Sequence, residues 1–360
     1  MAGARGHLVD AYCHGVLPGD LGIGAFEARL PGAAAPRTTL FDSPAGFAVR
    51  RWCPPLLGLE PHCSPARYLA RRRELGAYEA ARLLLRGTGI RAYLVDTGEP
   101  GDLTPPKELG AAGGAPAYEI VRLEPLAQQV ADTSGTVDGF LANLAESVHG
   151  AALSAVGFSC AAEPPSFGSA PAHGPPGPSQ VRAAAAYWLG VRRVGERPYD
   201  PVLLRHLVWH GVAAGLPLVL RYRQDGPGPT AAEGFLRAVE GAGSDVVLLP
   251  GKAHESAAAR LAADLPHVNV AVGTDPSGVL SRAPFGKVLY AGSAVGLPEL
   301  YVTGARAFSG ALDRLVAERV AAGEWSAADG QRVAALVGEG NARRVYRLPA
   351  GDADGLRQGR

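Results

Sequence analysis

A tyrosine and a histidine near the start of the chain stand at a spacing that suits chemistry. Tyr12 and His14 lie at the end of the mostly apolar segment LVDAYCH, residues 8–14. If this segment is a strand, alternate side chains share a face, so residues 12 and 14 point the same way. A His-x-His pair at such a strand end is the usual first half of a hydrolase metal site, and here a tyrosine replaces the first histidine. A phenol and an imidazole at this spacing can also act as acid and base.

An arginine ends another apolar run. Arg221 closes the segment LPLVLR, and an arginine in that place is costly to bury unless an acid or a ligand meets it. Arg223 would share its face, and two guanidinium forks suit a carboxylate or a phosphate. The alternative is a salt bridge from Arg221 to Glu124 or Asp96, with Arg223 in solvent.

Three residues are therefore predicted to carry the reaction, with the arginine holding an anionic group: Tyr12, His14 and Arg221. The side chains expected to bind the substrate around them are Arg223, Asp96, Glu124, Ser159, His254 and Ser293. For each of these residues the alternative is an ordinary structural role.

Two other pairs of reactive side chains are not interpreted as catalytic. Ser159 and Cys160 are adjacent, but no GxSxG motif surrounds them, and small buried residues are the simpler account. His206 and His210 stand four residues apart on one expected helix, without the HExxH motif of a metalloprotease.

The composition of the chain indicates which kinds of partner and which cellular location to expect. The chain has 360 residues, 47% of them hydrophobic and 19% charged, which suits a well-buried core, and its net charge of +1 predicts no nucleic-acid or membrane partner. Its four cysteines form no CxxC motif, and a chain of this length needs no disulfide framework. The start of the chain has no signal-peptide pattern, and no run of about 18 apolar residues occurs. We expect a cytoplasmic protein.

Short apolar runs alternate with longer amphipathic ones along most of the chain. The apolar runs are continuous, which is typical of strands buried on both faces of a parallel sheet. Strands are predicted at His7–Tyr12, Ile90–Asp96, Tyr118–Leu123, Ala155–Cys160, Leu216–Tyr222, Asp245–Leu249, Val268–Val272 and Lys287–Ala291. Helices are predicted at Pro65–Arg86, Asp138–Val148, Gln180–Leu189, Pro201–Ala214, Thr230–Glu240 and Glu255–Asp264. Strands separated by helices favour a (β/α)8 barrel, and the lack of a GxGxxG turn after the first strand argues against a doubly wound sheet.

One domain is predicted over residues 1–350. Residues 15–64, rich in Gly and Pro, form a long excursion after the first strand that we expect to cap the mouth of the barrel. The proline-dense stretch Pro164–Pro178 predicts a mobile loop. After the last strand, helices are expected at Pro298–Ala322, Ser326–Gly338 and Asn341–Tyr346, and residues 351–360 are expected to form a flexible tail.

A set of collinear segments carries a family resemblance over nearly the whole chain. The segments are VDAYCH (9–14), RRWCPPLLGLE (50–60), ARYLARRRELG (66–76), YLVDTG (93–98), RLEPLA (122–127), VGF (156–158), GLPLVLR (215–221), APFGKVLYAGSA (283–294), LPELYVTGARAF (297–308) and NARRVYRL (341–348). Together they resemble the amidohydrolase-related family, in the branch related to the amidohydrolase-like half of nodulin/glutamine-synthetase-like proteins. The resemblance implies a (β/α)8 barrel with metal ligands at the carboxyl ends of its strands.

This chain departs from the implied ligand set at most positions, and only His14 matches. The replacements are Tyr12 for the first histidine of strand 1, Ser159 for a lysine on strand 4, Arg221 for a histidine on strand 5, Pro250 for a histidine on strand 6 and Ser293 for an aspartate on strand 8. A catalytic zinc ion needs about three protein ligands and an open position. A guanidinium in the same mouth would also repel a divalent ion.

The leading hypothesis is a metal-independent enzyme that acts on a small anionic, carboxylate-bearing substrate at the mouth of the barrel. No cofactor is expected, and zinc or manganese would be expected only if the family site were intact. Isomerase, lyase and condensation chemistry are all compatible. The alternatives are an inactive binding or scaffold partner, for example of a ligase or synthetase, and a metal-dependent C–N hydrolase whose ligands are misassigned. A homo-oligomer is compatible with each.

Overall fold

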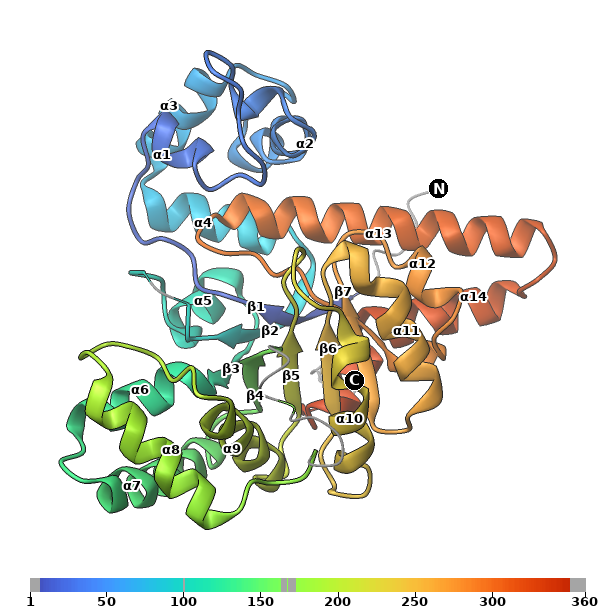
Figure 1. Ribbon diagram of the computed structural model, residues 1–360. Coiled ribbons are helices and arrows are strands. Elements are labelled where there is room, and N and C mark those ends of the chain that lie inside the picture. The colour runs from blue at the N-terminus through green and yellow to red at the C-terminus, as the bar shows by residue number, and fades with distance from the viewer. Residues whose placement is uncertain (1–6, 100, 163–166, 168–172, 350–360) are drawn as a thin grey trace, which may run out of the picture.

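The computed structural model describes residues 7–99, 101–162, 167 and 173–349. Its strands form one eight-stranded parallel sheet in chain order, with helices around it (Figure 1), which confirms the predicted (β/α)8 barrel. The strands are β1 (Leu8–Cys13), β2 (Ile90–Asp96), β3 (Ala117–Arg122), β4 (Gly157–Ala161), β5 (Leu218–Arg221), β6 (Val246–Leu249), β7 (Val268–Val272) and β8 (Val288–Tyr290). The expected tail at 351–360 and most of the expected loop at 164–178 lie outside the described residues.

The helices lie between the strands and after the last strand in the sequence. They are α1 (Ile23–Glu27), α2 (Pro44–Trp52), α3 (Pro65–Leu75), α4 (Ala77–Arg86), α5 (Pro106–Gly113), α6 (Leu123–Thr133), α7 (Val137–Ala152), α8 (Pro178–Val191), α9 (Pro201–Ala213), α10 (Glu233–Val239), α11 (Glu255–Asp264), α12 (Ser277–Leu280), α13 (Pro298–Ala321), α14 (Ala327–Ala335) and α15 (Asn341–Val345). Among the residues described, no helix is both long and apolar enough to cross a membrane.

Several helices begin at side chains that cap the free backbone N–H groups. Ser64, Thr136, Asp200 and Ser326 each accept a hydrogen bond from the first turn of α3, α7, α9 and α14. The predicted helix at 65–86 is two helices, because Gly76 between α3 and α4 has a φ of 80°. The sequence pattern also missed α5 and α6. In α5, glycines interrupt the helical spacing of apolar residues. The first residue of α6, Leu123, is the end of a predicted strand.

The barrel closes where β1 meets the chain after β8. The backbone N–H of Ser293 donates to the carbonyl of Tyr12 at 2.9 Å, and that of His14 donates to the carbonyl of Ala294 at 3.0 Å. Ser293 adopts a φ of 50°, which is uncommon for a residue with a side chain. The chain after β8 therefore turns sharply beside the residues that begin the predicted site.

A β-bulge in β1 sets which side chains enter the barrel. The pairing with β2 shifts between Asp10 and Cys13, so one strand carries an extra residue there. As a result Ala11 and Tyr12 both lie among the side chains that fill the barrel. Most of those side chains are alanine, valine or isoleucine, and α15 packs against the same cluster through Ala342 and Val345.

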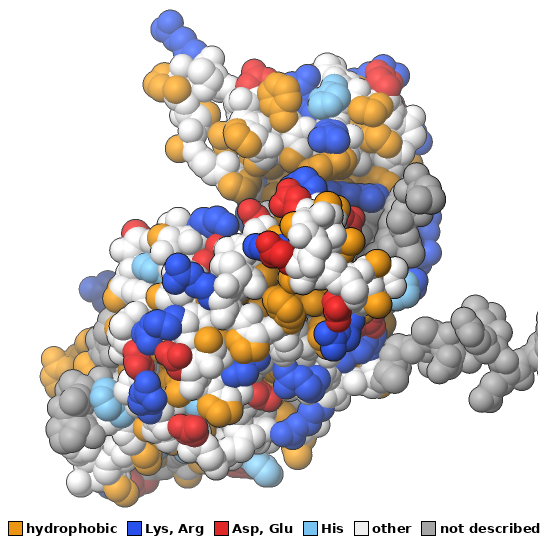
Figure 2. Space-filling view, turned by 90° about the vertical axis from the view of Figure 1, so that its right-hand side faces the viewer, with side chains coloured by type: hydrophobic (Ala, Val, Ile, Leu, Met, Phe, Trp, Pro, Cys, Tyr) orange, Lys and Arg blue, Asp and Glu red, His pale blue; other side chains and the backbone are white. Residues whose placement is uncertain are grey.

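The excursion after β1 and the helix that follows it form a separate lobe, which we define as residues 17–76. Its apolar side chains pack with Leu84 of α4 and with Leu297 and Val302 near the start of α13. The lobe lies on the outer side of α4 and α13, away from the sheet (Figure 1). In the space-filling view it stands out from the rest of the molecule (Figure 2).

A buried ion pair joins this lobe to the barrel. Arg72 Nε of α3 lies 3.0 Å from Glu299 Oε1 of α13, and the two side chains are 6% and 0% exposed. Tyr68 donates its hydroxyl to the same carboxylate oxygen at 2.6 Å. The Arg72 guanidinium also lies over the ring of Phe26, 5.5 Å from its centroid. The lobe is thus held by one charged contact inside an apolar interface.

We expect Glu299→Gln to destabilise the protein by about 3–5 kcal/mol, because it leaves the Arg72 charge buried without its partner. Urea unfolding followed by circular dichroism measures this change. The control is Glu324→Gln, which breaks the exposed pair with Arg319 and should cost less than about 1 kcal/mol. Equal small losses in both variants would show that the buried pair does not hold the lobe.

Candidate functional site

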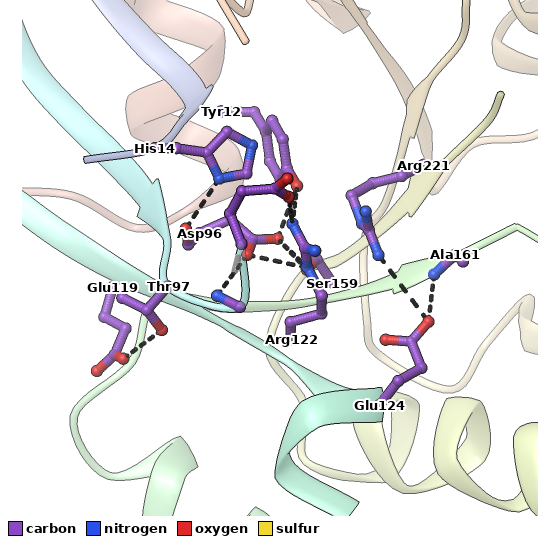
Figure 3. A network of polar contacts seen from close by, with 12 residues as sticks. Tyr12, His14, Asp96, Thr97, Glu119, Arg122, Glu124, Ser159, Ala161 and Arg221 are labelled. Atoms are coloured by element: carbon purple, nitrogen blue, oxygen red, sulfur yellow. Dashed lines mark hydrogen bonds and ion pairs between the residues drawn. The ribbon is translucent and has the colours of Figure 1, made fainter. Parts of the chain in front are cut away.

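A buried carboxylate at the end of β2 is the centre of a hydrogen-bond network at the mouth of the barrel, where the strands end (Figure 3). Asp96 Oδ2 accepts from Tyr12 Oη at 2.6 Å and from Ser159 Oγ at 2.5 Å. Asp96 Oδ1 accepts from the backbone N–H of Gly98 at 2.8 Å and from Arg122 Nε at 3.1 Å. Burial acts to raise the pKa of Asp96, but the Arg122 charge and the two hydroxyl donors outweigh it and hold the pKa below its ordinary value. Asp96 is therefore an ionised, fully bonded carboxylate.

Arg122, the last residue of β3, is the cation of this network and is absent from the predicted site residues. Its side chain is 3% exposed, and its Nη2 donates to Glu99 at 3.0 Å and to Tyr12 Oη at 3.4 Å. The sequence signal that could have found it is the one that singles out Arg221, an arginine at the end of a mainly apolar strand. Only the structure shows which of the two arginines faces Asp96.

His14 lies beside this network with one ring nitrogen engaged. Its Nδ1 is 3.0 Å from the backbone carbonyl of Asp96, and since a carbonyl only accepts, Nδ1 carries the proton. Burial lowers the pKa of His14, partly opposed by the Asp96 charge, so the ring is neutral at neutral pH. Its ring meets that of Tyr12 edge to face, with centroids 5.2 Å apart. The lone pair of Nε2 has no hydrogen-bond partner among the described residues.

Arg221 at the end of β5 and Glu124 in the first turn of α6 form a second, looser group. Arg221 pairs with Ala161 in the register of β4 and β5, and the backbone N–H of Ala161 donates to Glu124 Oε1 at 2.5 Å. Arg221 Nη2 lies 4.0 Å from the same oxygen, the outer limit of an ion pair. Within the described chain, Arg221 Nε and Glu124 Oε2 are buried atoms without hydrogen-bond partners.

The remaining predicted residues lie around the mouth but outside both groups. Arg223 follows β5, is largely exposed and pairs with Asp225 at 3.3 Å. His254 ends a short 3-10 helix after β6 and is half-buried against the loop at Gly228. Ser293 is exposed after β8, and its backbone N–H donates to the carbonyl of Tyr12 in β1. The structure therefore brings Tyr12, His14, Asp96 and Ser159 together, and pairs Arg221 with Glu124.

A second carboxyl group lies on the opposite face of β1 from Tyr12. Asp10 is fully buried, and its Oδ1 accepts from the backbone N–H of Gly292 at 2.8 Å and of Tyr12 at 3.4 Å. Its Oδ2 and the hydroxyls of Tyr93 and Tyr290 are buried without hydrogen-bond partners in the described chain. Burial raises the pKa of Asp10 to about 7, against the two backbone donors. The group therefore titrates near neutrality inside the fold.

The residues at the mouth do not fit the metal that the family resemblance implies. In the described parts of the chain, no group of three His, Cys, Asp or Glu side chains is placed to hold a metal ion. Asp96 lies beside His14, and its carboxylate oxygens already bond Tyr12, Ser159 and Arg122. The buried guanidinium beside it would repel a divalent ion in the same space.

The comparisons with known proteins support the fold. No family model matches the sequence, and no curated protein matches it. A solved structure from Lactobacillus casei ATCC 334, described as a candidate metal-dependent hydrolase, is 21% identical with a TM-score of 0.74, over 95% of this chain and 96% of that one. A uronate isomerase from Thermotoga maritima is 13% identical with a TM-score of 0.67, over 94% of each chain. One from Bacillus halodurans C-125 is 12% identical with a TM-score of 0.62, over 97% and 95%. At these identities the likeness shows a shared fold and no more.

Asp10 should make the stability of the protein fall as pH rises. A carboxyl group whose pKa is about 7 when folded and about 4 when unfolded stabilises the fold below pH 4, and this contribution is lost as pH rises through 7. The loss amounts to about 4 kcal/mol. Asp10→Asn keeps an acceptor for Gly292 and cannot ionise, so it should be more stable than the wild type at pH 8. Urea unfolding from pH 4 to 8 tests this, with Asp225→Asn as the exposed control, and parallel curves for wild type and Asp10→Asn would contradict it.

Proposed function

We propose that this chain is a metal-independent enzyme that moves a proton on a small carboxylate-bearing substrate at the mouth of the barrel. The observation that carries the proposal is His14, a buried neutral imidazole whose Nδ1–H is tied to a backbone carbonyl. That bond fixes the tautomer and leaves the Nε2 lone pair without a partner among the described residues. A neutral imidazole with a free lone pair is a general base.

The arginine supports an anionic substrate. The side chain of Arg221 is 22% exposed, so solvent reaches it, and its nearest carboxylate oxygen is 4.0 Å away. Arg122 is different, because its side chain is 3% exposed and Asp96 and Glu99 already hold it. Arg221 is therefore the cation with capacity for a further carboxylate. Two solved structures of the same fold are uronate isomerases, and a uronate is a carboxylate-bearing sugar.

The reaction class that fits is isomerisation of a hydroxy-carbonyl compound. His14 Nε2 takes a proton from the carbon next to the carbonyl, and the electron pair of that C–H bond moves onto the carbonyl to give an enediolate. The hydroxyl proton then moves to the former carbonyl oxygen, and the proton held on His14 returns to the former carbonyl carbon, which completes the exchange without an oxidant or a further reactant. The hydroxyl of Tyr12 donates a hydrogen bond to Asp96, and burial raises the pKa of this phenol. Tyr12 therefore keeps its proton and positions His14.

The hydrogen-bond network around Asp96 supports a second candidate function, because its members bond one another. Tyr12, Asp96, Arg122 and Ser159 satisfy one another and are nearly fully buried. A mouth whose polar groups need no ligand suits a binding or scaffold protein that keeps the barrel without its reaction. The state of Arg221 and His14 separates the two candidates.

The test uses D-glucuronate in D2O, with exchange of the proton next to its carbonyl followed by NMR. We expect His14→Gln to slow the exchange by at least about 100-fold with little change in binding, because only the base is removed. Arg221→Ala should weaken binding by at least about tenfold. His149→Gln, which removes an exposed histidine of α7, is the control. Exchange that persists in His14→Gln overturns the proposal, and binding through Arg221 with no exchange in the wild type supports the scaffold candidate.

A further inference from the structure

The β4–β5 side of the mouth holds two buried polar atoms that nothing in the described chain satisfies. They are Arg221 Nε, a donor, and Glu124 Oε2, an acceptor. The side chain of Glu124 is 11% exposed, so little of it meets water. Buried polar groups without partners are costly, and native structures hold few of them. The two atoms belong to side chains that approach within 4.0 Å of each other.

The other bonds of these side chains do not account for the free atoms. Glu124 is the second residue of α6, and its Oε1 accepts from the backbone N–H of Ala161 and faces Arg221 Nη2. Oε1 thus makes the hydrogen bond between α6 and β4, whereas Oε2 makes none within the described chain. Arg221 Nε likewise has no hydrogen-bond partner in the described chain, whereas Nη2 lies 4.0 Å from Glu124 Oε1. The pair thus presents one free donor and one free acceptor on two side chains that approach each other (Figure 3).

From this pair we infer that the substrate carries a hydrogen-bond donor on the carbon next to its carboxylate, which makes it a 2-hydroxy or 2-amino acid. The carboxylate accepts from the Arg221 fork, and the neighbouring hydroxyl or ammonium group donates to Glu124 Oε2. An ionised carboxylate only accepts, so Glu124 rejects a ligand whose second carbon bears nothing but hydrogen. Glu124 is then a specificity-determining residue. This inference rests on the carboxylate site of the proposed function.

The contrast with the β1–β3 side of the mouth supports this assignment. There Asp96 accepts from Tyr12, Ser159 and Arg122, so a ligand would have to break existing bonds to reach it. At Arg221 and Glu124 a ligand makes new bonds and breaks at most one long ion pair. The charges of the pair also cancel, so a ligand with both a carboxylate and a donor matches it better than a simple anion.

Three probes that differ only at the second carbon test the inference: D-gluconate, 2-amino-2-deoxy-D-gluconate and 2-deoxy-D-gluconate, titrated into the full-length protein by calorimetry. We expect the hydroxyl or the ammonium compound to bind at least tenfold more tightly than the deoxy compound, and the tighter of the two identifies the donor. Glu124→Gln, which keeps an acceptor for Ala161, should reduce this preference by at least fivefold. Arg221→Lys and Arg221→Ala should weaken all three compounds, the alanine variant more.

Asp138→Asn is the matched control, because Asp138 is also the second residue of a helix and pairs with an arginine, but on the exposed surface of α7. It should leave all three affinities unchanged, and thermal melting checks that each variant is folded. Equal binding of the three compounds that is still lost in Arg221→Ala overturns this inference and leaves the proposed function standing. Binding that does not change in Arg221→Ala, or no binding of any compound, overturns both.

Discussion

The ion pair between Asp96 and Arg122 is the contact on which the rest of the mouth depends. A carboxylate and a guanidinium taken out of water at the centre of a barrel are stable only if every remaining hydrogen-bond position is filled. Tyr12, Ser159 and the backbone of Gly98 fill those positions on Asp96. The network therefore fixes the ends of β1, β2, β3 and β4 relative to one another. It also places the Asp96 carbonyl that orients His14.

Other buried charges occupy junctions in the same way. Glu299 joins the lobe to the barrel through Arg72 and Tyr68. Asp10 joins β1 to the turn after β8, but with backbone donors alone and no cation beside it in the described chain. This difference has a consequence for pH. A carboxylate with an arginine partner stays ionised, whereas burial of an unpaired one favours the protonated form.

The mouth consequently has two halves, which differ in how many of their polar groups are already hydrogen-bonded. The half around Asp96 has the composition of an active site, but its groups are bonded to one another. The half around Arg221 and Glu124 has fewer hydrogen bonds and is more accessible to solvent. His14, whose Nε2 is free, lies beside the half around Asp96. A reaction at this mouth would use the bonded half as a rigid support and the open half to hold the substrate, which agrees with the need for catalytic groups to be held in place by their neighbours.

The family resemblance and the alternation of apolar runs with helices were sufficient to predict the barrel and the approximate limits of its strands. They were not sufficient for α5 and α6, where glycine and a strand-like start hide the helical period. Among the site residues, the pattern at Tyr12 and His14 indicated a shared face, because that depends only on neighbours along one strand. The importance of Arg122 depends on which strand end faces Asp96, and this is decided by the closure of the sheet.

The sequence by itself determined that the mouth carries tyrosine, serine and arginine at positions where the family resemblance implies metal ligands. It did so because residue types at strand ends are read directly from the chain. The tertiary structure alone decided how those residues are used. Hydrogen bonds and ion pairs join side chains from strands up to 110 residues apart, as between Tyr12 and Arg122. Only the packed barrel shows that Arg122 is bonded within the network while Arg221 retains a free donor.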